Sequence, residues 1–468
     1  MFWKRVGIPR PTGNGYAVAP SCSVLRVAGG RVVTPAGIRE VDVAVDDQGR
    51  IAALEPWSGG GDIDARGMLV LPGAVDSHVH GRDPGFPEKE DFASLTVAAA
   101  AGGVTTVLDM PNTVPAVSTG QLLDAKRQWV EPRAAVDFGL WGMLRQSSTE
   151  DDVRSLAGAG ACGIKVYLGY AVRKPDAQVL YTPAAVDPDL EPPASYGTVA
   201  RLGSVLADAG LPVAAHAEDP SVLRASAVRV ETYPDLLASR PDAAESVAVA
   251  AMGALSRQYG FRLHVVHLAS AAGLRAVLAW RSAGAALSLE VTPNHLWLTD
   301  ADFGRLGPVM KMFPLIRTAA DRDALRSALL DGTIDNVATD HAPHSDDDKL
   351  HHPLATAHAG SPGVQTLLVS VLQLAGAKAA ARFCAATPAA LFGLQSKGTI
   401  EIGRDADLAI VEPGAPTVVE PALMLSRQRH SALNGLTFDH AVRATLLRGE
   451  PPAPGRGRWL APARLRQP

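Results

Sequence analysis

The chain has 468 residues, 47% of them hydrophobic, which is enough to bury a large core in two or three domains. Its 44 basic and 48 acidic residues are spread along the whole sequence and leave a formal charge of −4, so no basic stripe predicts a nucleic-acid partner. The three separated cysteines, the lack of a secretory signal and the lack of a run of ~20 apolar residues predict a cytoplasmic protein with neither a disulfide framework nor a membrane partner.

Both ends of the chain alternate apolar and polar residues in short runs, as strands with one solvated face do. Such runs fill residues 25–54 and return between residues 398 and 449. We expect the two ends to meet in a small β-sandwich domain built from residues 1–71 and 395–468.

The middle of the chain, residues 72–394, alternates strand-like apolar runs with alanine-rich helical stretches. This alternation predicts an α/β fold, and eight repeats predict closure into a (β/α)8 TIM barrel. Helices are expected at 91–101 and 243–258, and the stretch 169–200, rich in Pro and Asp, is expected to cross the barrel mouth. The eight expected strands span 73–78, 104–110, 135–143, 163–168, 212–217, 262–268, 287–292 and 334–340.

Five segments with metal-binding side chains each follow or close one of these apolar runs. Barrel enzymes keep their chemistry at the carboxyl ends of the strands, so the order of the segments indicates one shared site. The residues that we expect to bind metal are His78, His80, Lys165, His216, His267 and Asp340.

His78 and His80 lie two residues apart on one strand, so both imidazoles point to the same face and can share a metal ion. A structural pair of histidines is the alternative. His216 and His267 each close a buried strand and can bind a second ion, whereas His264 would point to the opposite side and serve a structural role.

Lys165 lies within an apolar strand, where an unpaired ammonium group is costly. A buried lysine tends to lose its proton, and the neutral amine can take up CO2 to become a carbamate that offers one oxygen to each of two metal ions. The alternative is a lysine that extends to the strand end or pairs with a carboxylate.

Asp340 closes the last strand and is the expected catalytic residue, because it can bind a metal ion and take a proton from a bridging water. An isolated Asp more commonly caps a loop. Two zinc ions roughly 3.5–4 Å apart would lower the pKa of the shared water to about 7, and manganese or cobalt could replace them.

Arg82, Asn112 and His344 are the expected substrate-binding residues. Arg82 offers two parallel donors to a carboxylate, and Asn112 adds a donor at the end of the second strand. Each alone suits a surface or turn role, but together they predict a small anionic substrate. The acidic run 345–348 is either a flap over the site or a solvated turn.

These motifs resemble the amidohydrolase superfamily, and within it the cyclic amidohydrolases of the dihydroorotase, allantoinase and dihydropyrimidinase group. The most specific stretches are 79–85, 102–113, 339–344 and 397–408. The resemblance implies a two-zinc centre on the six residues named above and hydrolysis of a ring amide by a bridging hydroxide.

Within that group the resemblance implies a carboxylated Lys165 and a proton transfer by Asp340 to the leaving nitrogen. Arg82, Asn112 and His344 look like the dihydroorotase branch, where these positions hold the substrate's carboxylate. The resemblance therefore implies interconversion of L-dihydroorotate and N-carbamoyl-L-aspartate in pyrimidine biosynthesis, by a homo-oligomer that we expect to be a dimer or a tetramer.

The sequence departs from the dihydroorotase pattern at several positions. Phe313 stands where a substrate-binding asparagine is usual, and a site loses discrimination when an amide is replaced by a ring. Asn294 and His295 replace a His-His or His-Tyr pair, Gly81 replaces a leucine, and His358 replaces a proline. Two alternatives stay open: hydrolysis of another ring, such as allantoin or a hydantoin, and a non-catalytic scaffold.

Overall fold

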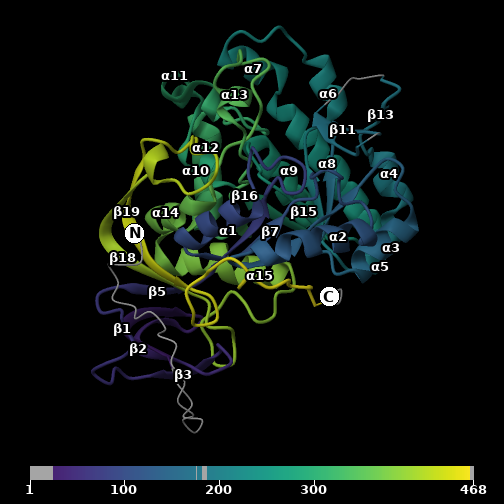
Figure 1. The fold of residues 1–468 in the computed structure, drawn as a ribbon. Helices are drawn as coiled ribbons and strands as arrows, with labels where there is room; N and C mark the ends of the chain where they lie inside the picture. Colours follow the sequence, from purple (N-terminus) through teal and green to yellow (C-terminus); the bar gives the residue numbers. More distant parts are fainter. Residues whose placement is uncertain (1–24, 175, 182–186, 464–468) are drawn as a thin grey trace.

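The computed structural model describes residues 25–174, 176–181 and 187–463 (Figure 1). The expectations for residues 1–24, Cys22 among them, and for residues 464–468 lie outside the described residues. The other two cysteines, Cys162 and Cys384, are buried and free.

Parallel strands from the middle of the chain form a closed barrel. One sheet has the order β17-β16-β15-β14-β10-β9 and the other the order β6-β7-β8. β8 and β9 share one strand position, interrupted at Trp141, whose backbone N–H donates to the carbonyl of Asp109 at 3.0 Å. The ring closes where Val79 pairs with His341. The eight positions confirm the predicted barrel. Their bounds are β6 (Ala74–Val79), β7 (Val104–Asp109), β8 (Asp137–Leu140), β9 (Gly142–Leu144), β10 (Ile164–Tyr167), β14 (Val213–His216), β15 (Leu263–Val265), β16 (Leu287–Val291) and β17 (Asn336–Val337).

Helices pack around the outside of these strands (Figure 1). The two helices predicted by residue range are present as α1 and α8. Asp91 is the N-cap of α1, and its carboxylate accepts from the backbone N–H of Ser94 at 2.8 Å. The helices are α1 (Phe92–Ala101), α2 (Gly120–Val130), α3 (Glu150–Gly158), α4 (Tyr196–Arg201), α5 (Gly203–Ala209), α6 (Pro220–Ala225), α7 (Tyr233–Ser239), α8 (Asp242–Tyr259), α9 (Ala271–Ser282), α10 (Pro293–Trp297), α11 (Phe303–Leu306), α12 (Ala319–Leu330), α13 (Asp346–Lys349), α14 (Leu367–Ala381) and α15 (Thr387–Leu391).

One helical stretch, Val364–Leu391, is long and apolar enough to cross a membrane, and half of its apolar window is buried. It contains α14, which breaks at Gly376 with a φ of 79° and packs against β5, β6 and β19. The core helix of a soluble barrel has the same composition, because its apolar face meets the sheet. The cytoplasmic location stays a prediction.

Strands from the two chain ends pair with each other in a seven-stranded sheet of order β19-β18-β5-β1-β2-β3, with β4 beside β1. This sheet has an apolar core of its own, which joins Val43 and Val70 to Leu408 and Ile410. The sandwich arrangement and the boundaries at residues 71 and 395 stay predictions. The strands are β1 (Leu25–Thr34), β2 (Gly37–Val45), β3 (Ile51–Glu55), β4 (Ile63–Asp64), β5 (Leu69–Pro72), β18 (Leu408–Val418) and β19 (Thr437–Leu446).

The segment that follows β19 returns to the barrel. Phe138 of β8 donates its N–H to the carbonyl of Arg458 at 3.0 Å, and its own carbonyl accepts from Leu460 at 2.8 Å. The ring of Trp459 packs 5.7 Å from that of Phe138. Residues 458–460 therefore pair in parallel with the edge of β8.

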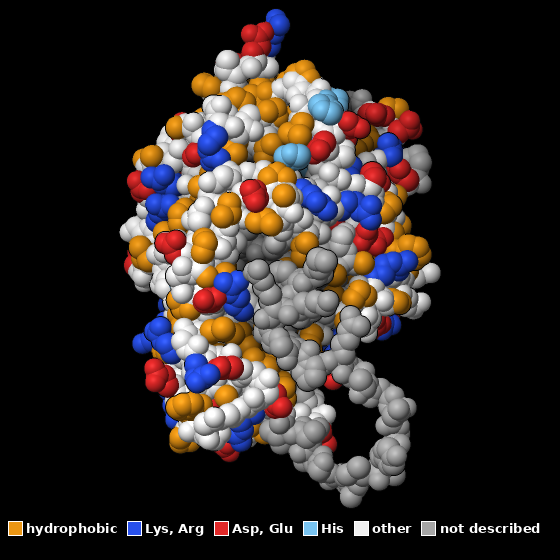
Figure 2. Space-filling view, turned by 60° about the vertical axis from the view of Figure 1, so that its left-hand side comes forward, with side chains coloured by type: hydrophobic (Ala, Val, Ile, Leu, Met, Phe, Trp, Pro, Cys, Tyr) orange, Lys and Arg blue, Asp and Glu red, His pale blue; other side chains and the backbone are white. Residues whose placement is uncertain are grey.

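The predicted excursion over the mouth is a three-stranded sheet of order β12-β11-β13. Residues of β11 and β12 line the pocket described below. The bounds are β11 (Tyr170–Arg173), β12 (Val179–Tyr181) and β13 (Leu190–Glu191). On the face shown in Figure 2, the described basic and acidic side chains are interspersed with apolar ones.

Candidate metal centre and substrate pocket

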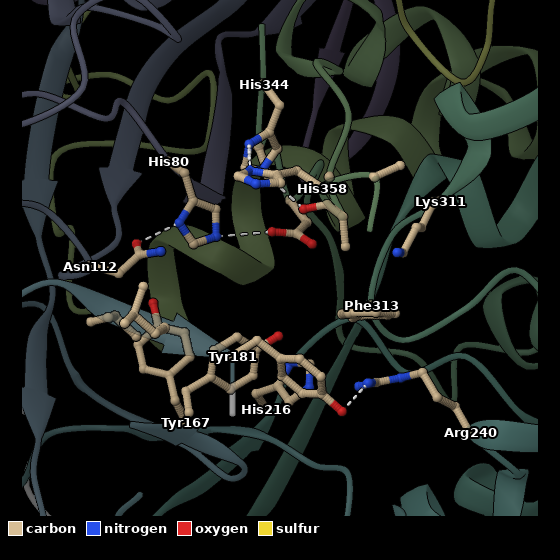
Figure 3. Close-up of a pocket in the computed structure, with 18 of the residues that line it drawn as sticks. His80, Asn112, Tyr167, Tyr181, His216, Arg240, Lys311, Phe313, His344 and His358 are labelled. Carbon is tan, nitrogen blue, oxygen red and sulfur yellow. Dashed lines mark hydrogen bonds and ion pairs between the residues drawn. The ribbon is translucent and has the colours of Figure 1, made fainter. Parts of the chain in front are cut away.

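All nine residues predicted for the site line one pocket of about 680 Å³ at the carboxyl ends of the barrel strands. Figure 3 shows several of them pointing into it from different strands and loops. His78 lies in β6 and His80 just after it, Lys165 in β10, His216 at the end of β14, His267 after β15 and Asp340 after β17. The barrel thus brings together residues that are up to 266 positions apart in the chain, as His78 and His344 are.

The histidines form two close groups. Asp340 Oδ1 lies 3.3 Å from His78 Nε2 and 3.1 Å from His80 Nε2. His216 Nδ1 lies 3.1 Å from His267 Nε2. The two groups are adjacent, because the rings of His78 and His267 lie 5.4 Å apart. Each of these two histidines places a ring nitrogen within 4.8 Å of the Asp340 carboxylate.

Buried carboxylates behind the histidines determine which ring nitrogen faces the pocket. Glu290 Oε1 lies 2.8 Å from His78 Nδ1. Glu218 Oε2 lies 3.0 Å from His216 Nε2. Because an ionised carboxylate only accepts, these nitrogens carry the hydrogen, and the other nitrogen of each ring presents a lone pair to the site.

The two carboxylates are ionised despite their burial. Burial alone would raise the pKa of Glu290, but His78 and His264 beside it hold that pKa below its usual value. Burial would also raise the pKa of Glu218, but the neighbouring Arg240 lowers that pKa. Each glutamate therefore stays able to orient its histidine at neutral pH.

Lys165 is completely buried on β10, and its Nζ has no hydrogen-bond partner. Burial lowers its pKa to about 8, although Asp340 and Glu290 act in the opposite direction. An uncompensated buried ammonium is costly, so the surroundings shift the lysine toward its neutral amine. The alternative of an ion-paired lysine is thus not what the fold contains.

This set of donors fits a metal centre. Burial lowers the pKa of His78 to about 4 and holds those of His80 and His267 well below their usual value, so the imidazoles are neutral and free to bind a cation. Imidazole nitrogens together with carboxylate oxygens suit zinc. The orphaned Nζ of Lys165 is the atom that a carbamate would convert into a further pair of oxygen ligands.

The backbone is strained at the site. Arg82, His267 and Asp340 have φ values of 58°, 41° and 47°, in the left-handed region that favours glycine. They are three of the five such non-glycine residues in the described part of the chain. Each costs on the order of 1–3 kcal/mol, and such strain clusters where side chains must be aimed precisely at a ligand.

The predicted substrate-binding residues lie at one side of the pocket mouth. Arg82 is 3.3 Å from the carbonyl of Pro343 and 3.2 Å from His344 Nε2, and it makes no ion pair with any described residue. Asn112 Oδ1 accepts from His80 Nδ1 at 2.6 Å, so the amide NH2 stays available. The corner between Arg82 and Asn112 therefore offers donors without a negative partner.

A sequence profile of the amidohydrolase family matches residues 69–451. The chain belongs to this family. It is 37% identical to an allantoinase of Streptomyces avermitilis over 434 residues, which cover 90% of this chain and 93% of that protein. It is 36% identical to a dihydroorotase of Mycobacterium tuberculosis over 446 residues, with 90% and 96% covered. Among solved structures, an L-hydantoinase (dihydropyrimidinase) from Arthrobacter aurescens superposes with a TM-score of 0.85 at 28% identity, with 93% and 99% covered.

These relatives confirm the predicted resemblance to the cyclic amidohydrolase group, and with it the prediction of a metal-dependent enzyme. The alternative of a non-catalytic scaffold finds no support in them. An allantoinase and a dihydroorotase match this amidohydrolase at almost the same identity, so dihydroorotase activity itself stays a prediction.

The wall of the amidohydrolase pocket opposite His344 contains residues that sequence reasoning missed. The Arg240 guanidinium lies 3.5 Å from the centre of the Phe313 ring and donates to Glu218 at 3.1 Å. The Tyr181 ring lies 5.2 Å from that of Phe313 (Figure 3). Phe313, which the sequence marked only as a departure, is thus the centre of a stacked wall.

Two further residues had a signal in the sequence. Tyr167 follows Lys165 by two positions on β10, so both side chains share a face, and the buried Tyr167 hydroxyl has no partner. Glu290 is a charged residue inside a predicted buried strand, where a carboxylate needs a partner. The alternation of side chains between the two faces of a strand would have indicated both residues.

Proposed function

We propose that this amidohydrolase opens a cyclic amide by hydrolysis of a ring C–N bond, and that an allantoin-like five-membered ring is its substrate. The observation that carries the proposal is the buried, partnerless Nζ of Lys165 among four histidines and Asp340. Such an arrangement is costly unless a cation and a modified lysine complete it.

The residues that would hold two zinc ions are His78, His80, Lys165, His216, His267 and Asp340. When bound, the ions would supply a water acidic enough to act as hydroxide at neutral pH and would polarise the ring carbonyl. Carboxylation of Lys165 forms a bond between its neutral Nζ and the carbon of CO2 and releases one proton to solvent. A pKa of about 8 leaves part of the amine neutral at physiological pH, which supports this step.

Asp340 is the residue placed to move the proton. Its Oδ1 lies between His78 and His80, and its left-handed backbone conformation holds the carboxylate toward the pocket. It would take the proton from the attacking water and deliver it to the ring nitrogen that leaves. The Tyr167 hydroxyl, which lacks a partner, is available to donate to the substrate carbonyl.

Two observations support the allantoin-like ring. The allantoinase relative is 37% identical, and the structure that superposes over 93% of the chain is named an L-hydantoinase, for a five-membered ring, as well as a dihydropyrimidinase, for a six-membered one. In addition, Phe313 replaces an amide at the pocket wall, which removes a donor and an acceptor for the polar edge of a larger ring.

Dihydroorotate is the second candidate, and Arg82 favours it. This side chain is 9% exposed and has no carboxylate within ion-pairing distance among the described residues. A buried guanidinium without a counter-charge suits an anionic substrate, as the carboxylate of dihydroorotate is.

The test is a panel of allantoin, hydantoin, L-dihydroorotate and dihydrouracil, offered to the purified protein loaded with zinc in bicarbonate buffer. Hydrolysis gives a product that is one water heavier, which mass spectrometry detects. We expect allantoin to be opened fastest and Asp340→Asn to slow that reaction by about 10²–10⁴-fold. Asp323→Asn, at an exposed position on α12 far from the pocket lining, is the matched control.

The outcomes separate the two candidates. Turnover of dihydroorotate with allantoin inert would establish the second candidate and leave the site assignment intact. A protein that binds zinc and opens none of the four rings would overturn the proposed reaction. The homo-oligomer, the cytoplasmic location and the absence of a nucleic-acid or membrane partner belong to the same proposal.

A further inference from the structure

Three groups of acidic or histidine side chains in the described part of the chain bring ligand atoms within 4.8 Å of one another. The first belongs to the centre described above. The second, Asp137, Asp405 and Asp407, surrounds the ammonium of Lys397, which occupies the position that a cation would take. The third consists of His344, Asp348 and His358 at the pocket mouth, and we refer to it as the mouth triad.

The mouth triad has the spacing of a metal site. His344 Nδ1 lies 3.2 Å from His358 Nδ1, and Asp348 Oδ1 lies 4.0 Å from the same nitrogen. Two nitrogens that bind one zinc ion at 2.0–2.1 Å in tetrahedral geometry are about 3.3 Å apart. The pairs of the main centre, at 3.1 and 3.3 Å, show the same spacing. Figure 3 shows His344 and His358 facing each other above the pocket.

The contacts around the triad leave at least one lone pair at its centre. His344 Nε2 lies 3.0 Å from the carbonyl of Ala359, which only accepts, and 3.2 Å from the guanidinium of Arg82, which only donates, so either ring nitrogen of His344 can carry the hydrogen. His358 Nδ1 faces the ammonium of Lys89 at 3.5 Å, which only donates, so this nitrogen presents a lone pair. When the hydrogen of His344 is on Nε2, its Nδ1 lone pair faces that of His358 at 3.2 Å, and a divalent ion fits between them.

Positive groups limit how strongly the triad can bind a cation. Lys89 Nζ lies 3.1 Å from Asp348 Oδ2, and Arg82 lies 3.2 Å from His344. A divalent ion would have to displace Lys89 from the carboxylate. The site is open to solvent, because the side chains of His358 and Asp348 are 46% and 27% exposed. Affinity should therefore be lower than at the buried centre, and exchange should be fast.

We propose that the mouth triad is a third metal site, which binds zinc or a similar divalent ion once the main centre is filled. His358 is essential to it, and this is the histidine that departs from the proline usual at that position. An ion there ties His344 and α13 to the loop at residue 358. It also covers the corner beside Arg82 through which a substrate reaches the centre, so excess zinc inhibits the enzyme.

Binding is measured first, because it does not depend on the substrate. The enzyme is saturated with zinc, and further Zn²⁺ is titrated against a chromophoric chelator, while Co²⁺ in place of Zn²⁺ reports the coordination through its visible absorption. Wild-type protein should bind one equivalent more than His358→Ala and Asp348→Asn. His351→Ala, an exposed histidine of the same loop paired only with Asp347, is the matched control and should keep the additional equivalent.

Inhibition is the second readout and rests on the proposed function, with any cyclic amide that the enzyme opens as substrate. Each protein is compared with its own rate at low zinc. The zinc concentration that halves the rate should rise at least about tenfold in His358→Ala, since loss of a ligand costs no less than loss of its supporting partner. In Lys89→Met that concentration should fall about fivefold or more, because removal of a unit charge near the ion favours binding.

Each possible result either supports the proposed third metal site or overturns it. Equal zinc stoichiometry in wild type and His358→Ala overturns the site, whatever the enzyme hydrolyses. An additional equivalent that His351→Ala also loses reveals adventitious binding to the loop and overturns it as well. If His358→Ala loses the additional zinc equivalent while its inhibition by zinc is unchanged, the metal site stands but its proposed effect on substrate entry is overturned. Failure to open any ring affects only the proposed function, since the stoichiometry is measured without turnover.

Discussion

Two buried lysines of this amidohydrolase have opposite surroundings. Lys397, where the chain-end sheet meets the barrel, places its Nζ 2.7 Å from Asp407 and 2.8 Å from Asp405, with Asp137 as a third partner. Lys165, in the barrel, has no partner for its Nζ. Both side chains are nearly inaccessible to solvent. Burial alone therefore cannot distinguish a lysine that stabilises the fold from one that takes part in chemistry.

The charges around each lysine do distinguish them. Burial tends to lower the pKa of Lys397, but its three carboxylates outweigh burial and raise it. Burial lowers the pKa of Lys165 to about 8, since the opposing effect of the Asp340 and Glu290 carboxylates is smaller than that of burial. A fold neutralises the cations that it buries for structure, so an uncompensated one marks a site completed by something else.

The largest effect is expected from removal of the structural cation. Lys397→Met leaves three carboxylates buried without their shared partner, which costs about 3–5 kcal/mol of unfolding free energy. We expect partial unfolding or a large shift of the urea midpoint by circular dichroism. Lys165→Met in the metal-free protein is the matched control and should not lower stability, because it removes a buried charge that has no partner. Equal destabilisation by both substitutions would contradict the comparison.

The next effect concerns metal and activity. Lys165→Ala should lose bound zinc and at least about 100-fold in activity, while its circular dichroism spectrum stays unchanged. The cavity left by the side chain can admit a short carboxylate, whose two oxygens replace those of the carbamate. Added acetate should therefore restore part of the zinc content and the activity of Lys165→Ala and should not improve Asp340→Asn. If acetate acts on both variants alike, Lys165 is not a source of ligand oxygens.

The sequence predicted what depends on local pattern. Each barrel strand is an apolar run of its own, and the residue after it is fixed to the same end of the barrel, so His78, Lys165 and Asp340 could be assigned to one pocket without knowledge of contacts. The start of α1 was predictable for a similar reason, because Asp91 caps it within one turn.

Partners from distant segments could not be predicted. Lys397 and Asp137 are 260 residues apart in sequence, and nothing near either residue indicates the other. Arg240 reaches Glu218 and Phe313 because of the way α7 packs, and its position in the sequence is that of an ordinary residue after a helix. The interruption at Trp141 also escaped prediction, since the apolar run continues through it.

A smaller effect is expected in the pH dependence of stability. Because the pKa of Lys165 is lowered in the folded state from 10.5 to about 8, the unfolded chain binds more protons between these values, and stability rises with pH there. Between pH 8 and 9.5, metal-free wild type should gain about 1–2 kcal/mol relative to Lys165→Met. Lys397, whose pKa is raised, contributes fully below 10.5 and stays constant over this window.

The measurement is urea unfolding of both proteins at the two pH values, without metal and in buffer freed of CO2, so that no carbamate forms. Glu218 and Glu290 are ionised in both proteins throughout the window, so their contributions to stability cancel in the comparison. A wild type that loses stability relative to Lys165→Met as the pH rises would show that the amine is paired in the folded state.

The smallest effect is expected at Arg240. Its surroundings are intermediate between those of the two lysines, because a carboxylate neutralises one side of the guanidinium and an aromatic ring covers the other. Phe313→Asn removes the ring 3.5 Å from the guanidinium, a contact that contributes about 0.5–2 kcal/mol. Stability should fall by about 1 kcal/mol, since Glu218 still neutralises the charge. The new amide can bond a polar ring edge, so kcat/KM for dihydroorotate should rise relative to that for allantoin.

The control is Phe303→Leu, which removes a ring stacked on Tyr233 outside the pocket. This variant should lower stability similarly without changing the ratio of the two kcat/KM values. A ratio that moves equally in both variants would mean that Phe313 influences substrate choice only through packing.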